Sequence, residues 1–174
     1  MVIEQSKSES ESESECEVRR YYAGIGEMRV AHNPHQLIIM GLGSCIGLAL
    51  YDSHARVGGI AHIMLPDGKC DDSNTGKSCK FANRAVPVLL NEMLKHKARK
   101  EWIVAKIAGG ASVFSTMDML QIGKKNTIVV KESLKKEGIK LVAEDTGGNC
   151  ARTVTLDTCN GEFIVKTKEG VKRI

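Results

Sequence analysis

The fold is set by residues 41–65, which read GLGSCIGLALYDSHARVGGIAHIML. Two short apolar runs, 46–51 and 57–65, flank the polar segment 52–56. Apolar runs of this length, bounded by glycine or polar residues, are typical of β-strands, and a short polar segment between them is typical of a hairpin loop. These residues therefore predict an antiparallel hairpin whose first strand begins directly after Cys45.

The hairpin brings a thiol and an imidazole near each other. If the loop is centred on His54, the numbers of facing residues sum to about 108, so that Ile46 faces His62 and Cys45 lies one register step away. Directly opposed residues have Cβ atoms roughly 5 Å apart, close enough for Cys45 and His62 to interact. The prediction depends on this register, because a slip of one residue turns His62 to the other face.

Such a pair has the chemistry of a nucleophile and a base. His62 shares its side of the strand with Ile60 and Met64, so we expect a poorly solvated imidazole. A desolvated imidazole beside a thiol can form an ion pair whose cation lowers the pKa of the thiol. The alternative is a structural corner, in which a buried thiol and a histidine among apolar neighbours have no catalytic role.

Glycines surround the thiol. Gly41 and Gly43 allow the backbone to turn tightly and let a substrate approach. The backbone amides near Ser44 and Cys45 would then be free to face a developing oxyanion, a contribution typically worth about 10²- to 10³-fold in rate per donor. We therefore expect Gly43 and Ser44 to form an oxyanion-binding backbone loop.

The rest of the chain mixes strands with helices. Two stretches have apolar residues at helical spacing, and Pro87 is expected to kink or divide the first of these helices. Strands outnumber helices and hairpins are frequent, so the sequence predicts an α+β fold with mixed, largely antiparallel β-sheet layers and helices packed on their faces. The further strands are expected at 21–30, 36–40, 102–108, 139–143, 152–156 and 162–167, the helices at 79–97 and 124–136, and a long loop at 67–76.

The first residues differ in composition from the remainder. Residues 6–15 alternate serine with charged residues, nearly all glutamate, a pattern that repels itself and has nothing to bury. The sequence therefore predicts a disordered acidic tail at 1–17 and a single folded domain at 18–174. Since the whole chain has a formal net charge of +4 and the tail about −5, the folded domain carries about +9.

A basic domain raises the question of nucleic acid, because Lys and Arg neutralise phosphates. Aromatic residues make up only 4% of the chain, and no basic stretch is interleaved with aromatic residues for base stacking. We therefore expect a solvated, lysine-rich surface and no nucleic-acid partner.

The sequence gives no indication of a membrane span, a metal or a cofactor. The first residues lack the features of a signal peptide, and no apolar run approaches the roughly 20 residues that span a bilayer, so a cytoplasmic location is expected. The six cysteines are then expected to be thiols. No Cys-x-x-Cys pair or Cys/His quartet matches a zinc site. No role is assigned to Cys70, Cys79, Cys150 or Cys159, which lie in two nine-residue steps.

The motifs around the thiol and the imidazole resemble those of a known family. GLGSC at 41–45 and HIMLP at 62–66 are followed in order by AKIAGGA at 105–111, IGKKN at 122–126 and AEDTGGN at 143–149. This series is similar to that of the CheD family, the chemoreceptor glutamine deamidases. The resemblance covers about residues 22–167, and the acidic tail lies outside it.

The resemblance implies a cysteine-hydrolase-like fold and a protein-glutamine glutaminase acting in chemotaxis signalling. Such a hydrolase converts chosen glutamine side chains of chemoreceptors to glutamate through a Cys thioester, with Cys45 as nucleophile, His62 as base and no cofactor. Some members also hydrolyse glutamate methyl esters. The implied partners are the cytoplasmic helices of methyl-accepting chemoreceptors, through which alone the protein would approach a membrane, and a CheC-type phosphatase.

The chain departs from the family pattern at several positions. The family often has threonine six residues before the cysteine as a third catalytic member, whereas this chain has Ile39, so a dyad is expected, with a backbone carbonyl able to orient the imidazole. Phe81, Asn83 and Ala108 also differ from the usual residues. Ile39 motivates the alternative function, a weakly catalytic or non-catalytic binding module that regulates a CheC-type phosphatase.

Overall fold

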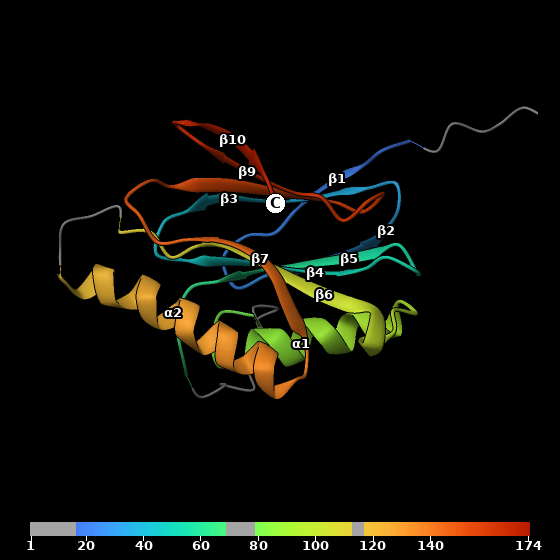
Figure 1. Ribbon diagram of the computed structural model, residues 1–174, viewed down its shortest axis with the longest axis horizontal. Helices are drawn as coiled ribbons and strands as arrows, with labels where there is room; N and C mark the ends of the chain where they lie inside the picture. Colours follow the sequence, from blue (N-terminus) through green and yellow to red (C-terminus); the bar gives the residue numbers. More distant parts are fainter. Residues whose placement is uncertain (1–16, 69–78, 113–116) are drawn as a thin grey trace, which may run out of the picture.

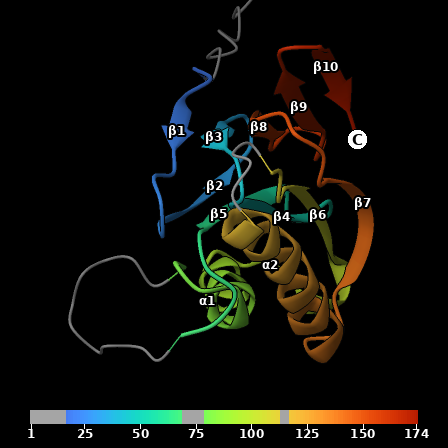
Figure 2. The ribbon, with the colours of Figure 1, turned by 90° about the vertical axis from the view of Figure 1, so that its left-hand side faces the viewer.

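The computed structural model describes residues 17–68, 79–112 and 117–174. Within these ranges two five-stranded sheets pack face to face, and both α-helices lie on the outer face of one of them (Figure 1). We call the sheet next to the helices the central sheet and the other the outer sheet. The side view in Figure 2 shows the same three layers, with the central sheet between the helices and the outer sheet.

Most strand pairs in the two sheets are antiparallel. The exceptions are β1 with β3 in the outer sheet and β6 with β7 in the central sheet, which are parallel. The predicted α+β fold with mixed, largely antiparallel layers is therefore confirmed. The central sheet has the order β2 (Met28–His32), β5 (Val57–Ile63), β4 (Ile46–Asp52), β6 (Ile103–Gly109) and β7 (Lys140–Thr146), and the outer sheet β1 (Arg20–Tyr22), β3 (Gln36–Leu42), β8 (Arg152–Asp157), β9 (Phe163–Thr167) and β10 (Gly170–Arg173).

The predicted hairpin, β4 with β5, lies inside the central sheet and is covered on both sides. All seven residues of each of these two strands are buried. Alternate residues of β4 face opposite layers: Ile46, Leu48 and Leu50 pack toward the helices, whereas Ala49 packs toward the outer sheet. The apolar runs that predicted the hairpin are thus strands with two buried faces.

Two helices cover the other face of the central sheet. The buried stripe of α1 (Ala82–Lys95) includes Val86, Leu89 and Met93, as the helical spacing predicted. Pro87 does not divide α1, which continues on both sides of it. The second helix, α2 (Met117–Lys136), begins before the predicted 124, and a short 3₁₀-helix, η1 (Lys100–Trp102), precedes β6. Neither α-helix in the described ranges is long and apolar enough to cross a bilayer.

The predicted strand 21–30 is wrong, because it consists of two strands in different sheets. A turn separates β1 from β2: Gly26 adopts a φ of +78°, and the carboxylate of Glu27 accepts a hydrogen bond from the N–H of Gly24 at 3.1 Å. Glycine adopts this positive φ without the steric cost of a side chain. The chain thereby passes from the outer to the central sheet within a few residues.

One strand was not predicted, and two predicted segments lie largely outside the described residues. Strand β10 was not predicted, because all four of its residues are exposed and it carries no alternating apolar signal. The predicted tail lies outside the described residues except for Glu17, and so does most of the predicted loop 67–76.

Candidate active site

The hairpin has a register one residue different from the predicted one. Gly47, and not Ile46, lies opposite His62. Facing residues share a side of the sheet and sides alternate along a strand, so Cys45, two residues before Gly47, is expected on the same side as His62. The predicted pairing was wrong, and the observed register is the one that brings the two side chains to a common face.

The loop explains the register. Asp52 faces Val57 directly, so four residues close the turn where five had been expected. The Asp52 carboxylate accepts hydrogen bonds from the N–H groups of His54 at 2.8 Å and Ala55 at 3.0 Å, and Arg56 adopts a positive φ of 49°. A buried Asp that satisfies loop amides is a common way to close a tight turn.

Both candidate residues lie in the layer between the two sheets. Cys45 is half-buried and packs against the apolar cluster that joins the inner faces of both sheets. His62 is only 3% exposed and borders a depression of about 300 Å³ that Tyr22, Gly24 and Gly41 also line. Both predicted residues thus lie in the layer between the sheets, and His62 borders the surface depression.

The surroundings of His62 favour the neutral imidazole. Burial lowers its pKa, and the nearby backbone carbonyl of Ala23 opposes this effect by favouring the protonated ring. Among the described residues neither ring nitrogen has a hydrogen-bond partner, so the expected hydrogen bond between Cys45 and His62 is not formed. A neutral ring with an available nitrogen can accept a proton.

The surroundings of Cys45 likewise favour the neutral thiol. Burial raises its pKa, and its own backbone N–H lowers it in part. The predicted ion pair, with a lowered thiol pKa, is therefore wrong for this resting state. Proton transfer to His62 would have to accompany attack on a substrate.

The carbonyls of the two residues before the thiol both accept hydrogen bonds. The carbonyl oxygen of Gly43 accepts from the N–H of Ala111 at 2.7 Å, and that of Ser44 accepts from the side chain of Asn126 at 3.0 Å. In a trans peptide the C=O and the following N–H point in opposite directions. The N–H group of Ser44 therefore points away from Ala111, and that of Cys45 away from Asn126, so neither is turned toward the donor that holds its own peptide.

Glycines permit the close packing of this loop. Gly41 adopts a φ of +71°, in keeping with the predicted tight turn. Gly109, at the end of β6, has a φ of +118°, and a Cβ atom there would lie 2.2 Å from the carbonyl oxygen of Cys45. Sequence reasoning noted Gly109 only as part of a motif and missed this contact.

Asn126 is the principal residue that sequence reasoning did not single out. It is fully buried on α2, and its side-chain nitrogen donates to the carbonyl oxygens of Ser44 at 3.0 Å and Met64 at 2.9 Å. The available signal in the sequence was an asparagine four and eight residues before Val130 and Leu134, on the apolar face of the predicted helix, where a polar side chain needs hydrogen-bond partners.

Ile39 lies beside the pair without polar contact. It is fully buried in the layer between the sheets, and a Cβ atom on Gly47 would lie 3.5 Å from its Cδ1. Gly47 faces His62, so Ile39 lies next to the strand position opposite the imidazole. It has no polar atom with which to orient the ring, and the Ala23 carbonyl is the backbone group near it.

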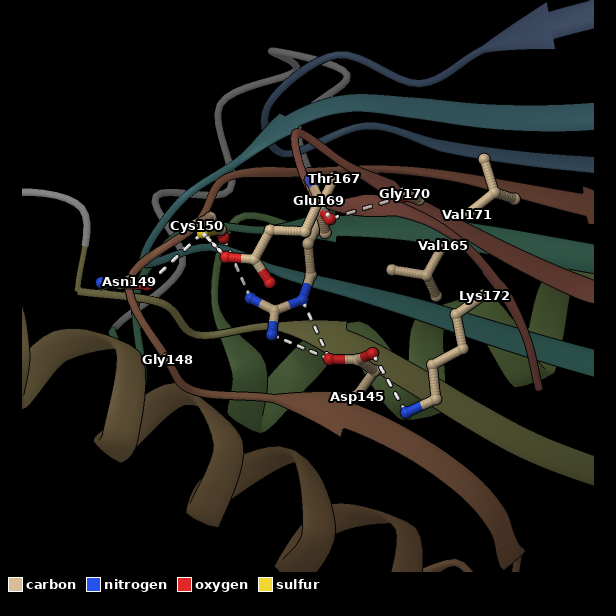
Figure 3. Close-up of a pocket in the computed structure, with 11 residues that line it drawn as sticks. Asp145, Gly148, Asn149, Cys150, Val165, Thr167, Glu169, Gly170, Val171 and Lys172 are labelled. Carbon is tan, nitrogen blue, oxygen red and sulfur yellow. Dashed lines mark hydrogen bonds and ion pairs between the residues drawn. The ribbon is translucent and has the colours of Figure 1, made fainter.

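A second pocket lies beside the turn that supports the thiol. It has a volume of about 340 Å³ and is lined by Asp145, Cys150, Glu169 and Lys172 among others (Figure 3). Arg152, which is nearly buried, pairs with Asp145 at 2.8 Å and donates to the carbonyl oxygens of residues 147 and 150. Burial alone would raise the pKa of Asp145, but Arg152 and Lys172 together lower it.

The segment held by the Arg152–Asp145 ion pair is connected to the candidate site through backbone hydrogen bonds. The Gly147 N–H donates to Gly109 at 2.9 Å, the Ser112 N–H donates to Gly148 at 2.8 Å, and the Gly110 N–H donates to Cys45 at 2.8 Å. The Arg152–Asp145 pair therefore supports the turn at 109–112, which is bonded to residues 43–45, here called the thiol loop. Among the described residues, no group of three or more His, Cys, Asp or Glu is placed to hold a metal ion.

The chain is similar to a well-defined set of proteins. A model of the CheD family, described as CheD chemotactic sensory transduction, matches residues 64–167. A Clostridium botulinum protein (strain Hall) is 45% identical over 154 residues, which is 87% of this chain and 94% of that protein. A Clostridium kluyveri protein is 43% identical over 162 residues, 91% of this chain and 99% of that protein.

Both relatives are named "Probable chemoreceptor glutamine deamidase CheD". Among solved structures, the Neisseria meningitidis protein NMB0706 has a TM-score of 0.46 at 13% identity, covering 75% of this chain and 64% of that one. That likeness supports no conclusion. Identity and coverage of the clostridial relatives show that the chain belongs to the CheD family.

Proposed function

We propose that this protein is a chemoreceptor glutamine deamidase, a hydrolase of chemotaxis signalling that converts receptor glutamine side chains to glutamate. The observation that supports the proposal is the register of β4 and β5: Gly47, two residues after Cys45, faces His62, and His62 borders a surface depression. The names of the clostridial relatives supply the reaction and the class of substrate.

The proposed reaction begins from the neutral pair. His62 takes the proton of the Cys45 thiol as the sulfur attacks the amide carbon of the glutamine side chain, giving a tetrahedral oxyanion. The N–H groups of Ser44 and Cys45, on the backbone loop that begins at Gly43, stabilise this oxyanion. Protonated His62 then gives its proton to the departing nitrogen, ammonia leaves, and a thioester remains on Cys45.

Water completes the cycle. His62 removes a proton from a water molecule, the hydroxyl attacks the thioester carbon, and the C–S bond breaks. Cys45 recovers its proton from His62, and the product is glutamate. A glutamate methyl ester needs the same groups, with methanol leaving in place of ammonia, so we include methylesterase activity in the proposal.

We propose that the protein acts in the cytoplasm on the helical cytoplasmic region of methyl-accepting chemoreceptors, with a CheC-type phosphatase as regulatory partner. The family membership supports this assignment. Mixing the two purified proteins in a sedimentation experiment tests the partner, and two independent species at all concentrations would remove the phosphatase from the proposal.

The deciding experiment incubates the protein with a purified receptor cytoplasmic fragment. Ammonia release and the conversion of Gln to Glu, mapped by peptide mass spectrometry, are expected for the wild type and lost in Cys45→Ala and His62→Ala. Cys159→Ala is the matched control, because Cys159 is an exposed thiol outside the candidate site. Equal conversion by wild type and Cys45→Ala would refute the proposed nucleophile, and receptor binding without any conversion would favour a non-catalytic regulator.

A further inference from the structure

One buried side chain ties together the two segments that carry the candidate pair. Asn126 projects from α2 and is fully buried, and its amide nitrogen donates to Ser44 and Met64. Ser44 directly precedes Cys45, and Met64 is two residues past His62. The relative position of nucleophile and base is thus held by a group that belongs to neither strand.

We propose that Asn126 is a positioning residue that sets the orientation of the Ser44–Cys45 peptide and so aims the Cys45 N–H at the reacting side. The nature of the reaction rests on the function proposed above. The geometry is that of a single peptide plane: with the Ser44 carbonyl held by Asn126, the Cys45 N–H must point the opposite way. This N–H also lies close enough to its own sulfur to favour the thiolate.

The position requires an amide and not merely a side chain of that size. The oxygen of the Asn126 side chain is buried and has no hydrogen-bond partner in the described part of the chain. A buried acceptor without a partner destabilises a fold, so an apolar residue would be preferable if packing alone mattered. The NH₂ group has two protons, and both carbonyls that they reach belong to segments next to the candidate pair.

Two glycines let the helix come close enough for this contact. A Cβ atom on Gly123 would lie 2.7 Å from the carbonyl oxygen of Gly110, and a Cβ atom on Gly110 would lie 2.8 Å from Oγ1 of Thr127. Helix α2 therefore packs directly on the turn after β6, whose Gly110 N–H bonds to Cys45. Asn126, three residues after Gly123, lies on the same side of the helix and reaches the loop.

The test compares Asn126→Asp with Val130→Ala. Asp has the same size as Asn but cannot donate two N–H bonds. Val130 lies one turn further along α2 and is also fully buried, so its truncation weakens the helix packing without touching either carbonyl. For each variant, folding is checked by circular dichroism and thermal unfolding. The kcat and KM for receptor deamidation are measured, and alkylation of Cys45 by iodoacetamide is followed against pH by peptide mass spectrometry.

We expect Asn126→Asp to lower kcat by about 10²-fold with little change in KM, the size of effect seen when an oxyanion donor is lost. Alkylation of Cys45 at pH 8 should fall about tenfold, which corresponds to a rise of about one unit in the thiol pKa. Val130→Ala should lower only the unfolding temperature. An Asn126→Asp protein that is merely less stable, with wild-type kcat and an unchanged alkylation profile, would overturn the proposal.

A measurement on the wild type keeps the proposal testable if Asn126→Asp does not fold. In an NMR experiment on the labelled protein, both side-chain amide protons of Asn126 should exchange slowly and show couplings across hydrogen bonds to the Ser44 and Met64 carbonyls. Fast exchange of both protons would overturn the proposal. The alkylation profile needs no receptor, so a wild type that fails to deamidate refutes the proposed function while Asn126 is still tested on its own.

Discussion

Replacing Gly109 by alanine should disturb the thiol loop more than any replacement of an unconstrained glycine. Gly109 has a φ of +118°, and an added Cβ atom would lie 2.2 Å from the carbonyl oxygen of Cys45. Contacts below 3.0 Å to backbone atoms force something to move. The carbonyl that must move belongs to the candidate nucleophile and accepts from Gly110 at 2.8 Å.

The expected loss in the free energy of unfolding of Gly109→Ala has two parts. Holding alanine in a backbone conformation of this kind costs about 1–3 kcal/mol, and inserting a methyl group into a closely packed contact costs about 1–3 kcal/mol more. The free energy of unfolding should therefore fall by about 2–6 kcal/mol. Gly138→Ala is the matched control: its φ is +67° and its Cβ would meet nothing within 4 Å, so only the backbone term of about 1–2 kcal/mol applies.

Urea unfolding of the two variants measures the difference, provided that the slope m is unchanged. The alkylation rate of Cys45 is the second measure, and it should change in Gly109→Ala and stay at the wild-type value in Gly138→Ala. Equal losses of stability in the two variants, with equal Cys45 reactivity, would show that the close contact between Gly109 and the thiol loop is not present in solution.

Three further predictions concern the His62 base, the hairpin loop closed by Asp52 and the Arg152–Asp145 ion pair. Because burial lowers the pKa of His62 and the base must be unprotonated, the acid limb of kcat/KM should reach half of its plateau below the ordinary histidine value of about pH 6.5; a half-point above that value would contradict the lowered pKa of the buried imidazole. Asp52→Ala leaves the N–H groups of His54, Ala55 and Arg99 without their carboxylate and should lower the unfolding free energy by about 3 kcal/mol or more, whereas Asp52→Asn should lose less; urea titration checks both. Arg152→Met should cost about 2–3 kcal/mol at neutral pH, below the range for a fully buried pair because the Asp145 side chain is 20% exposed. Since the folded-state pKa of Asp145 is lowered, the wild-type contribution is present above the unfolded pKa and disappears as pH falls through the folded one, so the two urea curves should converge in acid.

The sequence was sufficient for the class of fold and for most strands. Apolar runs such as those of β4 and β6 are long, and polar or glycine residues bound them, so they could be recognised without knowledge of their neighbours. The division of 21–30 between two sheets could not be recognised in this way. Gly24 and Gly26 permit a turn, but the sequence does not show that β1 and β2 pair with strands of different sheets. Strand β10 has no buried residue and hence no pattern to read.

The candidate site was predictable in its residues but not in its geometry. Cys45 and His62 stand out by chemistry and spacing. Whether the two side chains lie on the same side of the hairpin depends on whether the loop has four or five residues. The loop length is set by the hydrogen bonds of Asp52, which the sequence does not show. Asn126 lies 81 residues after Cys45, and its role depends on how closely α2 approaches the turn, which the packing of Gly110 against Gly123 decides.

The double burial of the β4–β5 hairpin has a consequence for insertions. In a sheet with one solvent-exposed face, a register slip of one residue would move apolar side chains to that face, and the hydrophobic effect would oppose the slip. Here both faces are buried, so a slip would exchange apolar side chains between two cores, and the length of the turn holds the register together with the close packing at Gly58 and Gly59. Adding one residue between Asp52 and Val57 could leave a folded protein whose thiol and imidazole face opposite layers, whereas adding two would preserve their parity. The reaction centre is therefore sensitive to whether this turn grows by an odd or an even number of residues.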